Sequence, residues 1–188
     1  MSSHHIVREK QEPALLVLGM DNFSDELLGQ LLEWSPTVMV TETTAEKLNA
    51  AGIKIDWVIA DHKNDIQSDI KYLPLNTNSV IKTAFEFLIA NNYTAVNVVT
   101  DELVITDYLS FVDKINLVIF HNHQKIYAIT SGFSKWKPAG EIINLLTNAE
   151  NLQVAGLEHI NETTYKTSAD GIFRIQFNGL YTLIAEPI

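Results

Sequence analysis

The sequence contains no cysteine and is short of basic residues. Without cysteine the chain can form neither a disulfide nor a thiolate metal site. Thirteen lysine and arginine residues stand against 23 aspartate and glutamate residues, a formal net charge of −10 at pH 7, and the basic residues form no cluster. Because nucleic-acid binding depends on clustered positive charge, we expect no nucleic-acid partner.

The sequence also lacks long apolar runs. No run reaches the roughly 18 residues that a membrane-spanning helix needs, and the N-terminus has no apolar core of a signal peptide. We therefore predict a cytoplasmic protein with no membrane partner. Residues 1–13 are polar and irregular, which is typical of a flexible leader.

Apolar patterns in residues 14–130 predict an N-terminal α/β domain. Short β-type runs alternate there with helical patterns, as in βαβ crossovers and a mainly parallel, Rossmann-like sheet. The predicted strands are residues 14–19, 37–41, 56–61, 95–100, 116–120 and 125–129. One predicted helix begins after Ser24, and two others occupy residues 44–51 and 79–90. A further crossover is predicted at residues 103–112.

Residues 131–188 show a different pattern, with brief β-runs separated by glycine. The runs are residues 133–136, 152–155, 172–176 and 181–185, and residues 140–146 form at most one helical stretch. This pattern predicts a small C-terminal antiparallel β-sandwich. A unit of this size buries little surface and usually relies on a partner domain or subunit.

Polar residues that follow predicted strands are the first candidates for a site, because ligands of open parallel sheets bind beyond the carboxyl ends of the strands. This rule selects residues 41–46 and 61–65. The second stretch, DHKND, carries two carboxylates, an imidazole and an ammonium. These groups suit a metal or phosphate site, but residue types alone favour a solvated charged loop.

Several segments, in matching order, resemble the thiamin pyrophosphokinase family. Residues 52–64, GIKIDWVIADHKN, resemble the segment in which Gly-Ile and Pro-Asp precede a strand and a Gly-Asp-Phe-Asp-Ser loop. Residues 40–48, VTETTAEKL, occupy the place of Ala-Asp-Gly-Gly-Ala-Asn, and residues 132–138, GFSKWKP, are similar to the Phe-Ser-x-x-Pro that leads into the family's β domain. With residues 156–159 and 179–184, the resemblance extends over nearly the whole chain.

The resemblance implies transfer of pyrophosphate from ATP to the hydroxyl of thiamin at a Mg²⁺ site, in a homodimer whose thiamin pockets involve the β domain. By position, Asp61 is expected to bind Mg²⁺ and to act in catalysis with Lys63. The expected ATP contacts are Glu42, Thr43, Thr44 and Asn78. The expected thiamin contacts are Thr167 and Ser168, although their hydroxyls suit the polarity of an edge strand equally well.

The sequence departs from the family at the acids that hold Mg²⁺. Of the Gly-Asp-Phe-Asp-Ser loop only the first acid remains, as Asp61, and Lys63 replaces the second. Mg²⁺ prefers oxygen ligands and is repelled by an ammonium, whereas lysine suits a phosphate. Two functions therefore stay open: ATP-dependent pyrophosphate transfer to thiamin, and a catalytically silent relative that binds a nucleotide, a thiamin-like ligand or a protein partner.

Two further groups of residues have a plain structural interpretation beside the functional one. His121 and His123 could bind a metal, but their position between two predicted strands favours a turn. Trp57, Trp136 and Tyr165 could stack on a heteroaromatic ring, but isolated aromatics among β-runs more often belong to a core.

Overall fold

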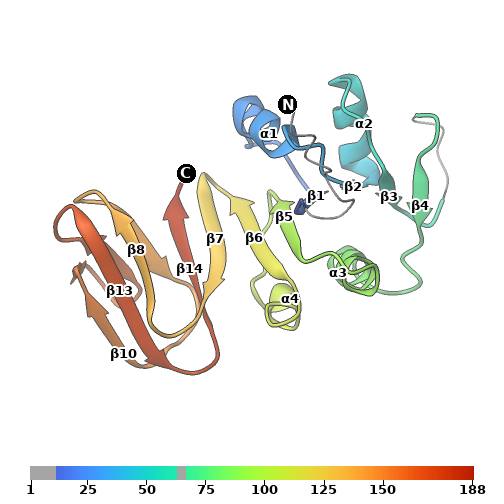
Figure 1. The fold of residues 1–188 in the computed structure, drawn as a ribbon. Coiled ribbons are helices and arrows are strands. Elements are labelled where there is room, and N and C mark those ends of the chain that lie inside the picture. The colour runs from blue at the N-terminus through green and yellow to red at the C-terminus, as the bar shows by residue number, and fades with distance from the viewer. Residues whose placement is uncertain (1–11, 63–66) are drawn as a thin grey trace, which may run out of the picture. The chain divides into compact units, whose positions relative to one another are not determined.

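A computed structural model describes residues 12–62 and 67–188 of the chain. The chain forms two compact units, Met1–Leu117 and Val118–Ile188 (Figure 1). The change of pattern in the sequence predicts a domain boundary at 130/131, whereas the two units divide at 117/118. The reason is that β7 (Gln124–Ile129) pairs along its whole length with the C-terminal strand β14 (Thr182–Pro187).

Unit 1 contains a parallel sheet with the strand order β5-β1-β2-β3-β4. Every residue of the central strand β1 is buried, as its continuous apolar sequence predicts. The mixed α/β class and the parallel sheet are confirmed. The strands are β1 (Ala14–Val17), β2 (Val38–Thr41), β3 (Trp57–Ile59), β4 (Lys71–Leu73) and β5 (Ala95–Val99).

The helices of unit 1 begin at hydroxyl caps. Ser24 Oγ accepts the backbone N–H of Leu27 at 3.1 Å, and Ser79 Oγ accepts that of Lys82 at 3.2 Å. One helix begins two residues earlier than predicted, because Thr41 rather than a later residue is its cap. The helices are α1 (Asp25–Leu32), α2 (Glu42–Ala50), α3 (Val80–Ala90) and the short α4 (Thr106–Leu109).

Unit 2 consists of antiparallel ladders. One series of paired strands has the order β11-β12-β9-β14-β7-β6, and the residues of β6 (Asn116–His121) span the boundary between the units. A separate three-stranded sheet has the order β10-β13-β8. The remaining strands are β8 (Phe133–Lys137), β9 (Ile142–Leu145), β10 (Glu150–Ala155), β11 (Leu157–His159), β12 (Thr164–Thr167) and β13 (Gly171–Asn178).

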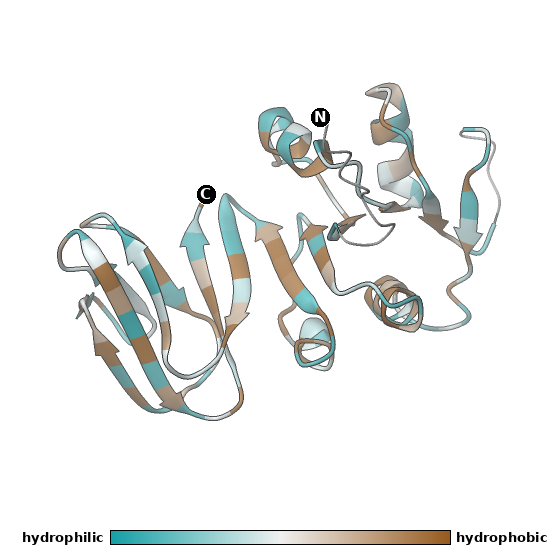
Figure 2. Ribbon diagram, viewed as in Figure 1, coloured by the Kyte–Doolittle hydropathy of each residue, from teal (hydrophilic) through white to brown (hydrophobic). Residues whose placement is uncertain are grey.

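The core of unit 2 follows from the period of two in its strands. Along β13, Phe173, Ile175 and Phe177 are buried while the residues between them are exposed. Figure 2 shows this alternation as successive brown and teal segments of β13. The buried side chains pack in one cluster with Ile143 and Ile184, from β9 and β14.

Some sequence predictions for unit 2 need correction. The helical stretch predicted at residues 140–146 is wrong, because this segment contains strand β9, which pairs with both β12 and β14 and buries Ile143 and Leu145 alternately with half-buried neighbours. Strands β4, β11 and β12 were not predicted; β4 and β11 are only three residues long. The turn between two strands is confirmed, with Asn122 and His123 both at positive φ.

The three aromatic residues differ in their surroundings. Trp57 packs against Phe87 with ring centroids 4.5 Å apart, and Tyr165 is buried in the unit 2 core. Trp136, in contrast, is 61% exposed on β8, so the core interpretation is wrong for it. Among the described residues no helix is both long and apolar enough to cross a membrane.

Candidate functional site at the carboxyl edge of unit 1

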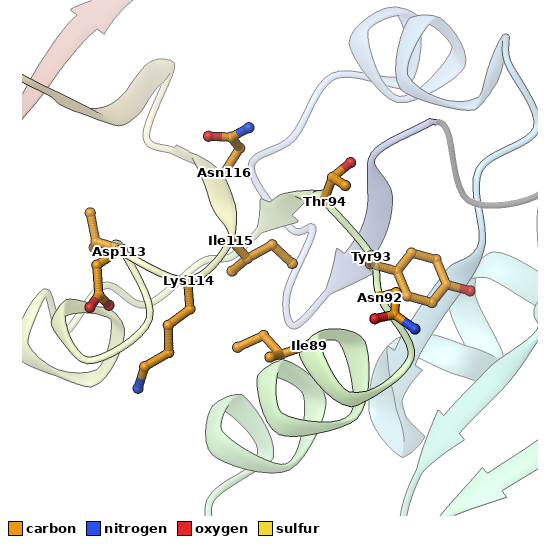
Figure 3. Close-up of a pocket in the computed structure, with 9 residues that line it drawn as sticks. Ile89, Asn92, Tyr93, Thr94, Asp113, Lys114, Ile115 and Asn116 are labelled. Carbon is orange, nitrogen blue, oxygen red and sulfur yellow. The ribbon is translucent and has the colours of Figure 1, made fainter.

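The amino-terminal ends of β5 and β6 border one pocket of unit 1. It has a volume of about 420 Å³, and its polar lining includes Asn92, Thr94, Asp113 and Lys114. In Figure 3 the side chains of Asp113 and Lys114 extend away from the Asn92 amide, so they present no convergent set of groups. Ligands of open parallel sheets bind at the opposite edge, beyond the carboxyl ends.

At that carboxyl edge, polar residues follow four of the five parallel strands. Asp21 follows β1, Thr41 ends β2, Asp61 follows β3 and Asp101 follows β5. Because the strands are parallel, their carboxyl ends lie along one edge of the sheet. The edge therefore collects side chains from residues widely separated in the sequence.

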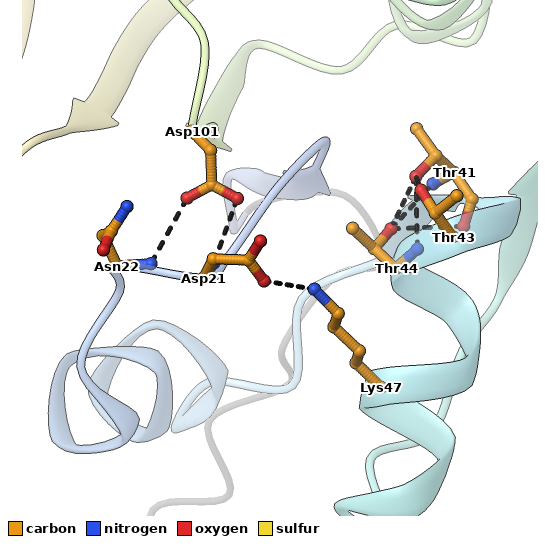
Figure 4. A network of polar contacts seen from close by, with 7 residues as sticks. All are labelled: Asp21, Asn22, Thr41, Thr43, Thr44, Lys47 and Asp101. Carbon is orange, nitrogen blue, oxygen red and sulfur yellow. Dashed lines mark hydrogen bonds and ion pairs between the residues drawn. The ribbon is translucent and has the colours of Figure 1, made fainter.

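Asp101 organises the loop that follows β1. Its Oδ2 accepts the backbone N–H of Asp21 at 3.0 Å, and its Oδ1 accepts that of Asn22 at 3.3 Å (Figure 4). The loop also passes close to Asp101, since a Cβ built on Gly19 would lie 2.5 Å from Oδ2 and 2.9 Å from the backbone nitrogen of Asp101. Only glycine permits this approach. Both carboxylate oxygens of Asp101 thus hold the loop in place.

Lys47 supplies an ammonium to the same edge. It extends from α2 to Oδ1 of Asp21, with which it forms an ion pair and a hydrogen bond (Figure 4). The hydrogen bond to Asp21 raises the pKa of Lys47, burial lowers it, and the charges of Asp21 and Asp101 raise it further, so the net pKa is above its ordinary value. Lys47 is therefore protonated at neutral pH.

Three threonines form the start of α2. Thr41 and Thr44 make a capping box, in which Thr44 Oγ1 accepts the backbone N–H of Thr41 at 3.0 Å and Thr41 Oγ1 accepts that of Thr44 at 3.3 Å. Thr44 is 2% exposed, and its hydroxyl also donates to the carbonyl of Val17 at 2.8 Å. The predicted ATP contact Thr44 is thus committed to the fold, whereas Glu42 and Thr43 are exposed at the helix start.

Asp61 and Asn78 lie around one turn. Oδ1 of Asp61 accepts the backbone N–H of Leu75 at 2.9 Å, and the backbone N–H of Asn78 donates to the carbonyl of Leu75 at 2.9 Å. Asn78 immediately precedes Ser79, the cap of α3. The structure therefore brings together two predicted site residues, one from the loop after β3 and one from the loop after β4. Lys63 lies outside the described residues.

The two predicted thiamin contacts belong to unit 2. Thr167 is 2% exposed, and its Oγ1 donates to the carbonyl of Pro138 at 2.6 Å and accepts the backbone N–H of Glu141 at 2.8 Å. Its side chain is fully used within the unit. Ser168 is exposed, and only its backbone N–H is engaged, with the carbonyl of Gly156 at 3.1 Å.

The described acids of the edge are largely engaged within the protein, which does not favour a Mg²⁺ site; Asp61 uses its Oδ1 to accept the backbone N–H of Leu75. Mg²⁺ is usually bound by one or two carboxylates with open oxygens, together with phosphates. Here both oxygens of Asp101 accept backbone N–H groups, and Asp21 is paired with an ammonium. Within residues 12–62 and 67–188 no three histidine, aspartate or glutamate side chains converge as a metal site.

Sequence analysis missed Gly19, Asp21, Lys47 and Asp101 as members of the site. The place of Asp101 directly after the predicted strand 95–100 was a usable signal, because the rule that selected residues 61–65 selects it as well. The role of Lys47 had no sequence signal, since it lies on a helix 26 positions from Asp21.

No protein-family model matches the sequence, and no curated protein matches it. Solved structures do match the fold. The thiamin pyrophosphokinase of Geobacillus thermodenitrificans is 11% identical, with a TM-score of 0.69, and 94% of this chain and 97% of that chain are covered. The enzyme from Bacillus subtilis is 10% identical, with a TM-score of 0.67 and coverages of 94% and 99%. That from Candida albicans is 11% identical, with a TM-score of 0.67 and coverages of 94% and 90%.

These features define a two-unit α/β protein with its candidate ligand edge at the carboxyl ends of a parallel sheet. More specifically, the chain has the thiamin pyrophosphokinase fold, along almost the full length of those proteins. The resemblance inferred from sequence motifs is confirmed at this level.

Proposed function

We propose that this chain is a thiamin pyrophosphokinase-like protein that binds a nucleotide at the carboxyl edge of unit 1, or a thiamin-like ligand, without transferring pyrophosphate. One observation carries the proposal: Asp101 uses both carboxylate oxygens, and Asp21 its Oδ1, to hold the edge together. Pyrophosphate transfer requires charge to be stabilised at several phosphate oxygens at once, usually by metal ions. An edge whose acids are engaged in this way supports binding better than transfer.

A coupled assay for AMP release in the presence of thiamin, ATP and Mg²⁺ tests this function. We expect no turnover above the rate without protein, together with calorimetric binding of thiamin or ATP. Turnover that Asp61→Asn abolishes would overturn the proposal and establish the enzyme. Absence of binding to both ligands would also overturn it and leave a role in contacts with a protein partner.

The second candidate function is ATP-dependent pyrophosphate transfer to thiamin with Mg²⁺. The fold favours it, and so does the presence of acids after three parallel strands, at Glu42, Asp61 and Asp101. In this case Asp61 would bind the metal and Lys63 a phosphate. Lys63→Asp should then strengthen Mg²⁺ binding, since it replaces a repelling ammonium with an oxygen ligand. An unchanged or weaker affinity would remove Lys63 from the site.

We also propose that unit 2 acts as the thiamin-binding β-sandwich and that two chains associate as a homodimer in the cytoplasm. The antiparallel series β11-β12-β9-β14-β7 and the three-stranded sheet β10-β13-β8, which share one apolar cluster, support the first point. The exposed Ser168 remains the candidate contact there. Ser168→Ala should weaken thiamin binding if the hydroxyl contacts the ligand, and light scattering after size-exclusion chromatography will measure the mass of the assembly.

A further inference from the structure

We propose that the ammonium of Lys47 takes the place of a divalent cation at the carboxyl edge of unit 1, so that the edge binds the phosphate group of a small molecule without a metal. This inference rests on the proposed function of the same edge and adds the ligand group and the residue that attracts it. It starts from the mismatch between the described acids and a Mg²⁺ site.

The position of Lys47 within the acid network supports this role. Its ammonium pairs with the carboxylate of Asp21, whose own backbone N–H is bound by Asp101 (Figure 4). A single positive charge thus lies at the junction of two loops that follow β1 and β5. A metal ion bound to the same acids would bring a second positive charge beside the ammonium of Lys47. The two cations would repel each other.

The Lys47 ammonium also keeps donors for a ligand. An ammonium has three N–H donors, and one is engaged by Asp21. The side chain is 49% exposed, so the remaining donors are accessible. Lysine binds phosphate as a point charge and needs no particular orientation of the anion.

The edge holds this ammonium in a fixed place. Lys47 lies one turn after Thr44, which is buried and bonded to the carbonyl at the end of β1. Asp21 is fixed from the other side by Asp101 and by the close passage of Gly19. Preorganisation of this kind reduces the entropy lost when a ligand binds.

The alternative is that Lys47 and Asp21 form an ordinary surface ion pair, which would contribute little to stability or to ligand binding. The chain offers a matched control for this alternative. Lys54 lies just before β3, at the amino-terminal edge of the sheet, where it pairs with Asp56 at 3.7 Å and has a side chain that is 85% exposed. Lys54→Met therefore removes the same charge from an exposed pair away from the carboxyl edge.

The test is calorimetric titration of ATP and of thiamin diphosphate into the wild-type protein, with EDTA and then with Mg²⁺. We expect at least one of the two to bind with the same Kd in both conditions. Lys47→Met should weaken that binding about tenfold or more in EDTA, Lys47→Arg should retain most of it, and Lys54→Met should leave it unchanged. The melting temperature of each variant, measured without ligand, shows that the variants are folded.

Three results would overturn the inference: binding that requires Mg²⁺, no binding of either compound in EDTA, or equal affinities of Lys47→Met and Lys54→Met. These outcomes are separate from failure of the proposed function. AMP release, or the absence of binding in every condition, would contradict the proposed function. Binding that depends on metal, or that does not depend on Lys47, would contradict this inference.

Discussion

Oδ2 of Asp101 accepts the backbone N–H of Asp21 at 3.0 Å, across 80 positions of sequence. This bond joins the loop after β5 to the loop after β1, two neighbouring strands of the parallel sheet. Since Asp21 also pairs with Lys47 of α2, three segments are linked through three side chains. The loops at the carboxyl edge are therefore held together by hydrogen bonds and an ion pair within the protein itself.

Gly19→Ala should destabilise the protein. The new Cβ would approach both the carboxylate and the backbone nitrogen of Asp101 closer than 3 Å, so the loop after β1 must shift. We expect a loss of about 1–3 kcal/mol in the free energy of unfolding, as for other overpacked sites, measured by urea denaturation.

Gly29→Ala is the matched control. Gly29 lies inside α1, and an added Cβ meets nothing within 4 Å. Alanine is favoured over glycine in a helix by about 0.5–1 kcal/mol, so this variant should be more stable than the wild type. Equal effects of the two substitutions would contradict the tight contact between Gly19 and Asp101.

Thr44→Val should weaken the attachment of α2 to the sheet. Valine has nearly the shape of threonine but cannot donate to the carbonyl of Val17 or complete the capping box. We expect a loss of about 1–3 kcal/mol in the free energy of unfolding, because a buried acceptor loses its partner. Thr44→Ser should recover most of the loss, and the exposed Thr43→Val should change stability much less. A neutral Thr44→Val would show that the hydroxyl is not needed.

Glu186 should make the stability of unit 2 depend on pH. Its side chain is buried between Lys135 and Lys137, whose ammonium groups lie 2.5 and 2.9 Å from its two oxygens. Burial raises the pKa of Glu186, but the hydrogen bonds and charges of the two lysines outweigh burial and leave the pKa below its ordinary value of 4.5. The carboxylate therefore stabilises the fold above pH 4.5, and this stabilisation is lost as the pH falls through the lower folded pKa.

Glu186→Gln should cost about 1–3 kcal/mol at neutral pH, since it removes the anion from the half-buried Lys135 and one of the two anions that pair with Lys137. Its free energy of unfolding should also fall less steeply with acidification than that of the wild type. Glu158→Gln, in an exposed pair with Lys166 at 3.4 Å, is the control and should change both quantities little. Parallel acid profiles of wild type and Glu186→Gln would contradict the prediction.

Phe173→Ala should have the largest effect in unit 2. Phe173 is 1% exposed in the apolar cluster, and removal of such a ring typically costs about 3–5 kcal/mol. Ile172→Ala, one residue earlier on the same strand, removes a side chain that is 67% exposed and should cost far less. Thermal or urea unfolding of the two variants measures the difference. A reversed order would mean that β13 presents its other face to the core.

Local signals in the sequence predicted most elements of unit 1. Ser24 and Ser79 mark helix starts because a hydroxyl satisfies a free backbone N–H, a property of a few adjacent residues. Residues 140–146 were predicted as at most one helical stretch, but pairing of β9 with β12 and β14, which lie elsewhere in the chain, makes the segment extended. Short strands such as β4 carry too few residues to show a period.

The sequence by itself determined the mixed α/β class, the change to antiparallel strands and the likeness to thiamin pyrophosphokinases, because these depend on periodicity and order along the chain. Only the tertiary structure decided which charges meet. Lys47 and Asp101 reach Asp21 from 26 and 80 positions away, since the order of strands in the sheet, and not distance along the chain, places loops beside one another.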